Sequence, residues 1–329
     1  MHGRYGMRLP LPGDDLADVR TPFAARMATL VPEPLQALRR FADARKPAGE
    51  RNTISGAQAN ISRHYDLSNE LFAEFLDETM TYSSAWFAGD TDDLATAQRR
   101  KIDGIPDLAG VRDGTRLLEI GTGWGELALR AAQRGAQVTT LTISAEQQTL
   151  ARKRLAEAGV ADRVEVVLSD YREAHGSYDA MASVEMIEAV GEEHWPAYFA
   201  TLDRLLAPGG RIGLQAITMP HDRMLATRHS YTWIHKYIFP GGQLLSREAI
   251  TDAVGHHTGL RIGTRRSLGD SYARTLRLWR QRFLDAWPRI TELGFDDTFR
   301  RMWEFYLAYS EAGFRGRYLD VVQFGLGKP

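Results

Sequence analysis

The segment from residue 115 to residue 218 alternates between strand-like and helix-like patterns, and this alternation constrains the fold more than any other feature. Short apolar runs typical of strands stand at 115–121, 136–143, 163–170, 178–186 and 210–218. Helical patterns lie among them at 124–135, 144–159 and 194–210. Ser144 is a favourable N-cap residue for the second of these helices. Such alternation predicts an α/β fold with a parallel sheet and helices on both faces.

Two flanking regions differ from this pattern. Residues 1 to about 55 contain much of the proline, with apolar residues at helical spacings between the prolines, which predicts an N-terminal helical extension. This extension is interpreted either as an arm that packs on the main domain or as a basic membrane-docking arm. A second apolar and aromatic block, at about 219–310, interrupts the chain before its closing segment 318–329. We expect this block to be an insertion in a main domain that spans residues 56–329.

Composition excludes several classes of protein. The chain has no cysteine, which rules out disulfides, thiolate zinc sites, iron–sulfur clusters and a cysteine nucleophile. Histidines and acids show no metal-ligand spacing, so no metal is expected. The net charge of −1 gives no global attraction to nucleic acid, and no nucleic-acid partner is expected. Without a signal-peptide core or a run of about 20 apolar residues, the expected location is the cytoplasm.

A glycine turn follows the first expected strand. Gly121, Gly123 and Gly125 stand at every second position, and Glu119 precedes them by two residues. Dinucleotide folds use G-x-G-x-x-G to hold a pyrophosphate, whereas an acid before the turn would repel one. A carboxylate there fits an ammonium group, such as that of the methionine part of S-adenosylmethionine (SAM). A nucleotide and simple tight packing are the alternatives.

The ends of the next two strands offer groups for a nucleoside. Thr142 and Gln147 supply neutral hydrogen bonds, and the Asp170 carboxylate is suited to accept one from an adenine amino group. Tyr171 stands beside it and would cover the ring. For each residue the alternative is an ordinary cap, a solvated group or a packing side chain.

Several motifs, in this order, resemble the cyclopropane-fatty-acyl-phospholipid synthases and the mycolic acid cyclopropane synthases. They are "HYDLSNELFAEFLDETMTYSSAWF" (64–87), "EIGTGWG" (119–125), "TISAEQ" (142–147), "SVEMIEAVG" (183–191), "YIFPGG" (237–242) and "GDSYARTLRLWRQRF" (269–283). The resemblance covers residues 56–329. It implies a class I, Rossmann-like SAM-dependent methyltransferase, in which the block at 219–310 forms a helical lid over a lipid-binding acyl-chain pocket.

The resemblance also implies a reaction and a site. A methyl-derived carbon passes from SAM to the cis double bond of an unsaturated phospholipid acyl chain, through a carbocation, to give a cyclopropane. In the family a bound bicarbonate accepts the proton that is lost. The groups that match its site are the side chains of Glu188, Tyr272 and Gln215 and the backbone of Ser84 and Ile217. On the SAM side the resemblance implies that Tyr82 and Ser83 meet the methionine carboxylate. Gly121 and Gly123 would line the amino-acid end, and Thr142 and Gln147 would lie on the ribose and adenine side.

Two positions depart from the family pattern. Ser84 replaces a cysteine whose backbone alone is used, and Gln215 replaces a histidine. A glutamine amide still donates to a bicarbonate oxygen, but it carries no charge and relays no proton. The cyclopropane remains the expected product. The alternative is an exocyclic methylene formed after a hydride shift, with a reductase partner completing a methyl branch. A second alternative is N-methylation of a small amine, because plant alkaloid N-methyltransferases share these motifs.

Neighbouring groups and partners complete the expectations. Glu185 lies three residues before Glu188 and is expected to make a structural hydrogen bond rather than act in catalysis. The basic run at 99–101 is interpreted as a solvated helix face, with phosphate headgroups as the alternative. We expect peripheral contact with the inner face of the membrane, where the phospholipid is presented. The oligomeric state is left open, with a homodimer as one alternative.

Overall fold

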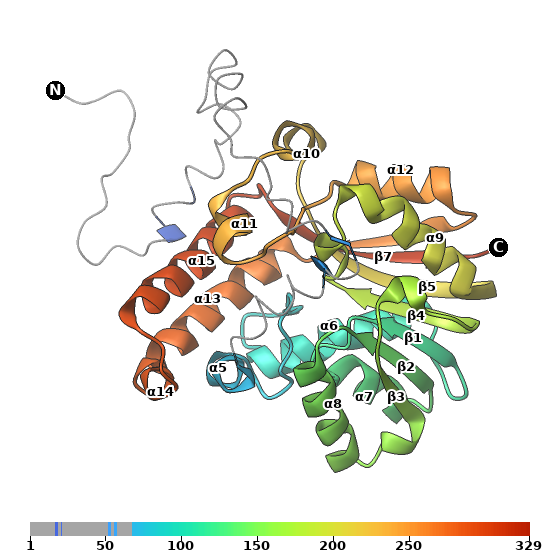
Figure 1. The fold of residues 1–329 in the computed structure, drawn as a ribbon, viewed down its shortest axis with the longest axis horizontal. Coiled ribbons are helices and arrows are strands. Elements are labelled where there is room, and N and C mark those ends of the chain that lie inside the picture. Colours follow the sequence, from blue (N-terminus) through green and yellow to red (C-terminus); the bar gives the residue numbers. More distant parts are fainter. Residues whose placement is uncertain (1–16, 19–20, 22–51, 54–55, 58–67) are drawn as a thin grey trace.

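The computed structural model describes residues 17–18, 21, 52–53, 56–57 and 68–329, and Figure 1 shows their arrangement. The described residues form a seven-stranded sheet with the order β3-β2-β1-β4-β5-β7-β6. The strands are β1 Arg116–Ile120, β2 Gln137–Thr142, β3 Val164–Leu168, β4 Tyr178–Val184, β5 Leu206–Thr218, β6 Arg261–Ser267 and β7 Asp320–Gly327. Strands β1 to β5 are parallel, and β7 runs antiparallel to both β5 and β6. The predicted Rossmann-like α/β fold is confirmed.

Helices cover both faces of this sheet and extend beyond one end of it (Figure 1). The first group is α5 Asn69–Phe75, α6 Leu94–Ala109, α7 Glu126–Gln133, α8 Ala145–Glu157 and α9 Trp195–Leu205. The second group is α10 His221–Thr227, α11 Trp233–Tyr237, α12 Arg247–His257, α13 Gly269–Asp285, α14 Trp287–Glu292 and α15 Asp297–Arg315. Short 3₁₀ helices are η2 Ala161–Arg163, η3 Tyr171–Glu173, η4 Ile187–Ala189 and η5 Glu192–His194. The predicted cap of α8 is present, because the Ser144 hydroxyl accepts a hydrogen bond from the Gln147 backbone at 3.2 Å.

A separate aromatic core holds the helices that lie beyond the sheet. It joins α5, α13 and α15, and its largest fully buried side chains are Phe72, Phe75, Trp279, Phe283 and Trp303. Rings such as those of Phe72 and Trp303 meet edge to face, 6.3 Å apart, which suits their quadrupoles. This core makes α13 and α15 a rigid wall beside the sheet.

The block at 219–310 contains more than lid helices. Its helices α10, α11, α13, α14 and α15 lie outside the sheet, but β6 forms an edge strand of the sheet and was not expected. The sequence of β6, "RIGTRRS", is polar and largely exposed, so it lacks the apolar alternation that marks a strand. The expected N-terminal extension lies almost entirely outside the described residues. No helix in the described part of the chain is long and apolar enough to cross a membrane.

Candidate active site

A cavity of about 1650 Å³ opens at the carboxyl ends of the parallel strands. Its walls come from the loops after β1 to β5 and from α10, α11, α13 and α15. The expected site residues that line it are Tyr82, Ser83, Glu119, Gly121, Gly123, Thr142, Gln147, Asp170, Tyr171, Glu188, Ile217 and Tyr272. Ser84 and Gln215 do not line it and lie fully buried behind its wall. One space thus collects groups that are far apart in the sequence.

The glycine turn forms the cavity wall after β1. Gly121 and Gly123 have φ angles of 97° and 51°, in the left-handed region that favours glycine. A Cβ on Gly123 would meet no atom within 4 Å, so this part of the turn faces open space. The backbone amides of Gly121 and Thr122 both donate to the Leu141 carbonyl at 3.0 Å, which ties the turn to the end of β2.

Glu119 supplies the one acid at the start of this turn. Its Oε2 accepts a hydrogen bond from the Thr140 hydroxyl at 2.6 Å, and the Thr140 and Thr122 hydroxyls are 2.7 Å apart. Burial raises the pKa of Glu119 to about 8. An ammonium placed beside it would favour the carboxylate and lower that pKa.

On the side of the cavity where the nucleoside is expected, polar side chains already form hydrogen bonds with one another. The Thr142 hydroxyl donates to Gln147 Oε1 at 2.9 Å, so these two expected contacts lie together. Asp170 accepts three hydrogen bonds from Arg172, including one from its Nε at 2.7 Å. Tyr171 packs edge to face on Tyr198, with ring centroids 5.4 Å apart. The structure thus places Tyr171 at the boundary of cavity and core.

Glu185 also lines the cavity, and its carboxylate accepts three hydrogen bonds. Its Oε1 accepts from the Ser84 backbone amide at 2.9 Å and from Gln215 Nε2 at 2.7 Å. Its Oε2 accepts from the Tyr272 hydroxyl at 3.0 Å. The expected structural hydrogen bond of Glu185 is therefore present, with two more. These three donors are the ones that the resemblance assigns to a bicarbonate.

A chain of side chains across three strands fixes the orientation of Gln215. Arg266 Nη1 on β6 donates to Gln323 Oε1 on β7 at 3.2 Å, and Gln323 Nε2 donates to Gln215 Oε1 at 3.0 Å. The Gln215 NH₂ group must then point toward Glu185, because its oxygen already accepts from Gln323. A histidine would not continue this chain of amides in the same way.

Glu188 stands on η4, beside this network. Its Oε1 accepts a short hydrogen bond from the Ile217 backbone amide. Its Oε2 is buried and has no hydrogen-bond partner among the described residues, and the residue lines the cavity. Burial, with the charge of Glu185 as a second cause, raises the pKa of Glu188 to about 8. An oxygen in this position is suited to accept a proton from a ligand.

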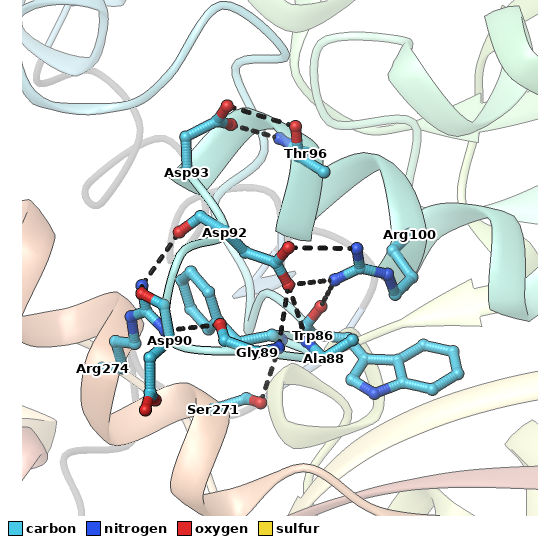
Figure 2. Close-up of polar contacts among 11 residues, drawn as sticks. Trp86, Ala88, Gly89, Asp90, Asp92, Asp93, Thr96, Arg100, Ser271 and Arg274 are labelled. Atoms are coloured by element: carbon cyan, nitrogen blue, oxygen red, sulfur yellow. Dashed lines mark hydrogen bonds and ion pairs between the residues drawn. The ribbon is translucent and has the colours of Figure 1, made fainter.

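The loop at residues 86–93 directly follows the segment that carries Tyr82, Ser83 and Ser84. Figure 2 shows the polar contacts of this loop. The Asp92 carboxylate accepts from the backbone amides of Ala88 and Gly89 at 2.7 and 3.2 Å. Arg100 on α6 also donates to it, which is the main reason that the pKa of Asp92 is lowered to about 2.

The same loop is attached to α13, the helix that carries Tyr272. Arg274 donates to the carbonyls of Gly89, Asp90 and Asp92 at 2.8 to 3.0 Å (Figure 2). Its guanidinium also lies over the Phe87 ring, 4.1 Å from the centroid. This clamp fixes the spacing between Ser84 and Tyr272, the two donors that approach Glu185 from outside the sheet.

Lys101 was not expected at the site, yet it lines the cavity with its side chain buried. The run at 99–101 is expected to be a solvated helix face, but Arg99 is only partly exposed and pairs with Glu78. The signal was available in the helical period, because Lys101 shares a face of α6 with the apolar residues Ala97 and Ile105.

A comparison with protein-family models decides the family. The model described as mycolic acid cyclopropane synthetase matches residues 53–324, which is most of the chain. The chain belongs to this family. Its members are SAM-dependent methyltransferases, and SAM is the cofactor.

Curated and solved members of the family match over most of the chain. Tuberculostearic acid methyltransferase UfaA1 of Mycobacterium tuberculosis is 56% identical, over 95% of this chain and 75% of that protein. Cyclopropane-fatty-acyl-phospholipid synthase of Escherichia coli K12 is 36% identical, over 86% of this chain and 72% of that protein. The structure of mycolic acid cyclopropane synthase CmaA1 complexed with SAH and CTAB has a TM-score of 0.77 at 30% identity, covering 86% of this chain and 99% of that one.

The residues present fit SAM. The Glu119 carboxylate faces the cavity without an ion-pair partner among the described residues and suits the ammonium of the cofactor. The glycine turn leaves open space at Gly123, and Thr142 and Gln147 lie farther along the same wall. A cavity of this size has room for a nucleoside and an acyl chain together.

Proposed function

We propose that this enzyme adds the methyl group of SAM to the cis double bond of an unsaturated phospholipid acyl chain and forms a methylene branch. A separate reductase then converts the methylene to a methyl branch. The observation that carries this proposal is the Glu185 carboxylate, which accepts all three hydrogen bonds from Ser84, Gln215 and Tyr272. In this proposal the Glu185 carboxylate occupies donors that the resemblance assigns to a bicarbonate, and a different residue accepts the proton.

The proposed chemistry needs no base for its first step. SAM supplies an electrophilic methyl, and the alkene is the nucleophile, so the new bond leaves a cation on the neighbouring acyl carbon. Tyr272 and Phe314, with ring centroids 4.6 Å apart, line the cavity near Glu185 and present aromatic faces to such a cation. Buried surroundings also keep water from capturing it.

The fate of this cation decides the product. Loss of a proton from the added methyl with closure of a third carbon–carbon bond gives a cyclopropane. A hydride shift from the methylated carbon instead moves the charge to that carbon, and loss of a methyl proton then leaves a C=CH₂ group. Burial raises the pKa of Glu185, and its hydrogen bonds to Ser84, Gln215 and Tyr272 oppose that rise. The same three hydrogen bonds hold the carboxylate in place, so it does not follow the methyl as a small bound anion would. We assign acceptance of the proton to Oε2 of Glu188, because that oxygen has no hydrogen-bond partner among the described residues and the residue lines the cavity.

The relatives support both products to different degrees. Tuberculostearic acid is a methyl-branched fatty acid, and the methyltransferase named for it is 56% identical to this chain. The Escherichia coli relative, at 36% identity, is named for the cyclopropane product. The cyclopropane expected from the sequence is therefore the competing product. Contact with the membrane surface and the inner-face location belong to this proposal, because the acyl chain is presented there.

The test is product analysis with carbon-13-methyl SAM and liposomes of a monounsaturated phospholipid. Methylene and cyclopropane products have the same mass, so NMR of the released acyl esters is required. Vinylidene signals are expected. High-field ring signals would instead identify a cyclopropane synthase, and label found only in added small amines would overturn the lipid assignment.

Two variants at Glu185 test the observation that carries the proposal. Glu185 has a φ of 49°, so Glu185→Gly removes the carboxylate without backbone strain. It frees the Ser84 and Tyr272 donors, and added bicarbonate is expected to shift its product toward cyclopropane. Glu185→Gln keeps the shape of the side chain and serves as the matched control. An unchanged product ratio in Glu185→Gly with bicarbonate would contradict the role given to Glu185.

A further inference from the structure

Lys101 places a buried ammonium in the cavity wall. The residue lies on α6, is 1% exposed, and lines the cavity together with Tyr82 and Ser83. Its Nζ donates to the Ser83 hydroxyl at 2.5 Å. Among the described residues, this is the one hydrogen bond found for the Lys101 ammonium. An ammonium has three N–H donors, so two remain for a ligand.

The acids around Lys101 lie too far from its ammonium to form an ion pair. Glu185, Asp77, Glu126 and Glu119 all act on it through space and oppose the effect of burial, which lowers its pKa to about 8. Among the described residues, however, no carboxylate lies within the 4.0 Å of an ion pair with its Nζ. Glu126, for example, pairs with Arg154 at 2.9 Å. Lys101 is thus kept charged without a carboxylate in contact with it.

Other cations of the cavity wall have carboxylate partners. Arg172 pairs with Asp170 at 2.7 Å, and Arg228 lies 3.5 Å from Glu192. A buried charge is costly unless it is paired, so a ligand anion is the partner that this site lacks. The cofactor of the proposed reaction carries one carboxylate, at its methionine end.

We propose that the Lys101 ammonium binds the methionine carboxylate of SAM. Glu119 then faces the ammonium of the same amino-acid group, and the Ser83 hydroxyl, held by Lys101, adds a second donor to the carboxylate. Two opposite charges in the wall thereby recognise the two opposite charges of the ligand. This inference rests on the cofactor of the proposed function but not on the lipid product.

The test compares two ligands that differ only in the carboxylate. These are S-adenosylhomocysteine (SAH) and its decarboxylated analogue S-adenosyl-3-thiopropylamine, whose affinities are measured by calorimetry. The wild-type protein is expected to bind SAH at least about tenfold more tightly, as a charge-assisted contact implies. Lys101→Met is expected to lose that preference, keeping its affinity for the analogue. Lys101→Arg keeps the charge and is expected to restore part of the preference.

Arg99→Met is the matched control, because Arg99 lies on the same helix but does not line the cavity, and its partly exposed side chain pairs with Glu78. It is expected to leave both affinities unchanged. Equal affinity of the wild-type protein for the two ligands would overturn the proposal, whether or not any variant folds. An equal loss of both affinities in Lys101→Met would also overturn it, since that indicates a structural role. Neither result depends on which lipid product is formed.

Discussion

At the scale of single residues, Glu188 offers the clearest prediction. The residue lines the cavity, its Oε2 has no hydrogen-bond partner among the described residues, and its Oε1 accepts from the Ile217 amide. Glu188→Gln keeps the acceptor for this amide but cannot take a proton, so turnover is expected to fall by at least about 100-fold. SAH affinity, measured by calorimetry, is expected to stay within about twofold. Turnover close to wild type would show that another group accepts the proton.

Glu119 gives a prediction on stability. Burial raises its pKa from 4.5 to about 8, so between these values the folded protein holds a proton that the unfolded chain releases. The free energy of unfolding therefore falls as pH rises from about 4.5 to about 8. Glu119→Gln removes this contribution, and without SAM its melting temperature is expected to exceed that of wild type at pH 8 but not at pH 5.

Calorimetric melting at both pH values checks this, with Glu165→Gln at an exposed site as the control. An identical pH slope in Glu119→Gln and wild type would refute the assignment. The same variant is expected to bind SAH at least about tenfold more weakly, since it loses the charge opposite the ammonium.

Much of the site could be anticipated from single residues. Glu188, Ile217 and Tyr272 were expected around one anion, and the structure brings them together in one cavity wall. The hydrogen bonds that the donors around this site make to Glu185 were not predictable in the same way. The orientation of Gln215 depends on Gln323, more than 100 residues away in sequence, and no local pattern contains that pairing.

At the scale of elements, the clamp between α6, α13 and the loop 86–93 has a measurable role. Arg274→Met removes three hydrogen bonds to loop carbonyls. It thereby loosens the loop that directly follows Ser84, whose amide donates to Glu185. A loss of about 1 kcal/mol is expected, or roughly 1–3 °C in melting temperature, with a severalfold lower turnover. Arg277→Met, at an exposed position of the same helix, is the control. Unchanged turnover in Arg274→Met would show that the clamp does not position the site.

The elements themselves differed in how well local patterns marked them. Strands β1 to β5 are apolar enough to be recognised, and the cap at Ser144 marked α8. β6 escaped because an edge strand is covered on one side only and keeps polar side chains such as Arg265. Its place in the sheet depends on pairing with β7. Local propensity does not reveal such a long-range pairing.

At the scale of the whole molecule, acids and aromatic rings share one cavity. Glu185 and Glu188 stand at one end, and Tyr272, Tyr306 and Phe314 contribute ring surface. A quaternary ammonium amphiphile is expected to compete with the lipid at least about tenfold better than an uncharged amphiphile with the same C16 chain, because the cavity favours positive charge. Inhibition constants of the two amphiphiles, measured at concentrations below their critical micelle concentrations, check this prediction. Equal inhibition would mean that apolar contact alone governs binding.

The place of β7 in the sheet has a consequence for biosynthesis. β7 follows every other described strand in the sequence, yet it lies between β5 and β6. While the ribosome is still making residues before 320, β5 has one open edge and β6 has no strand to pair with. Gln323, which orients Gln215, is also still missing. The nascent chain therefore presents open strand edges to other molecules until translation reaches β7, and only then can the pocket acquire its working geometry.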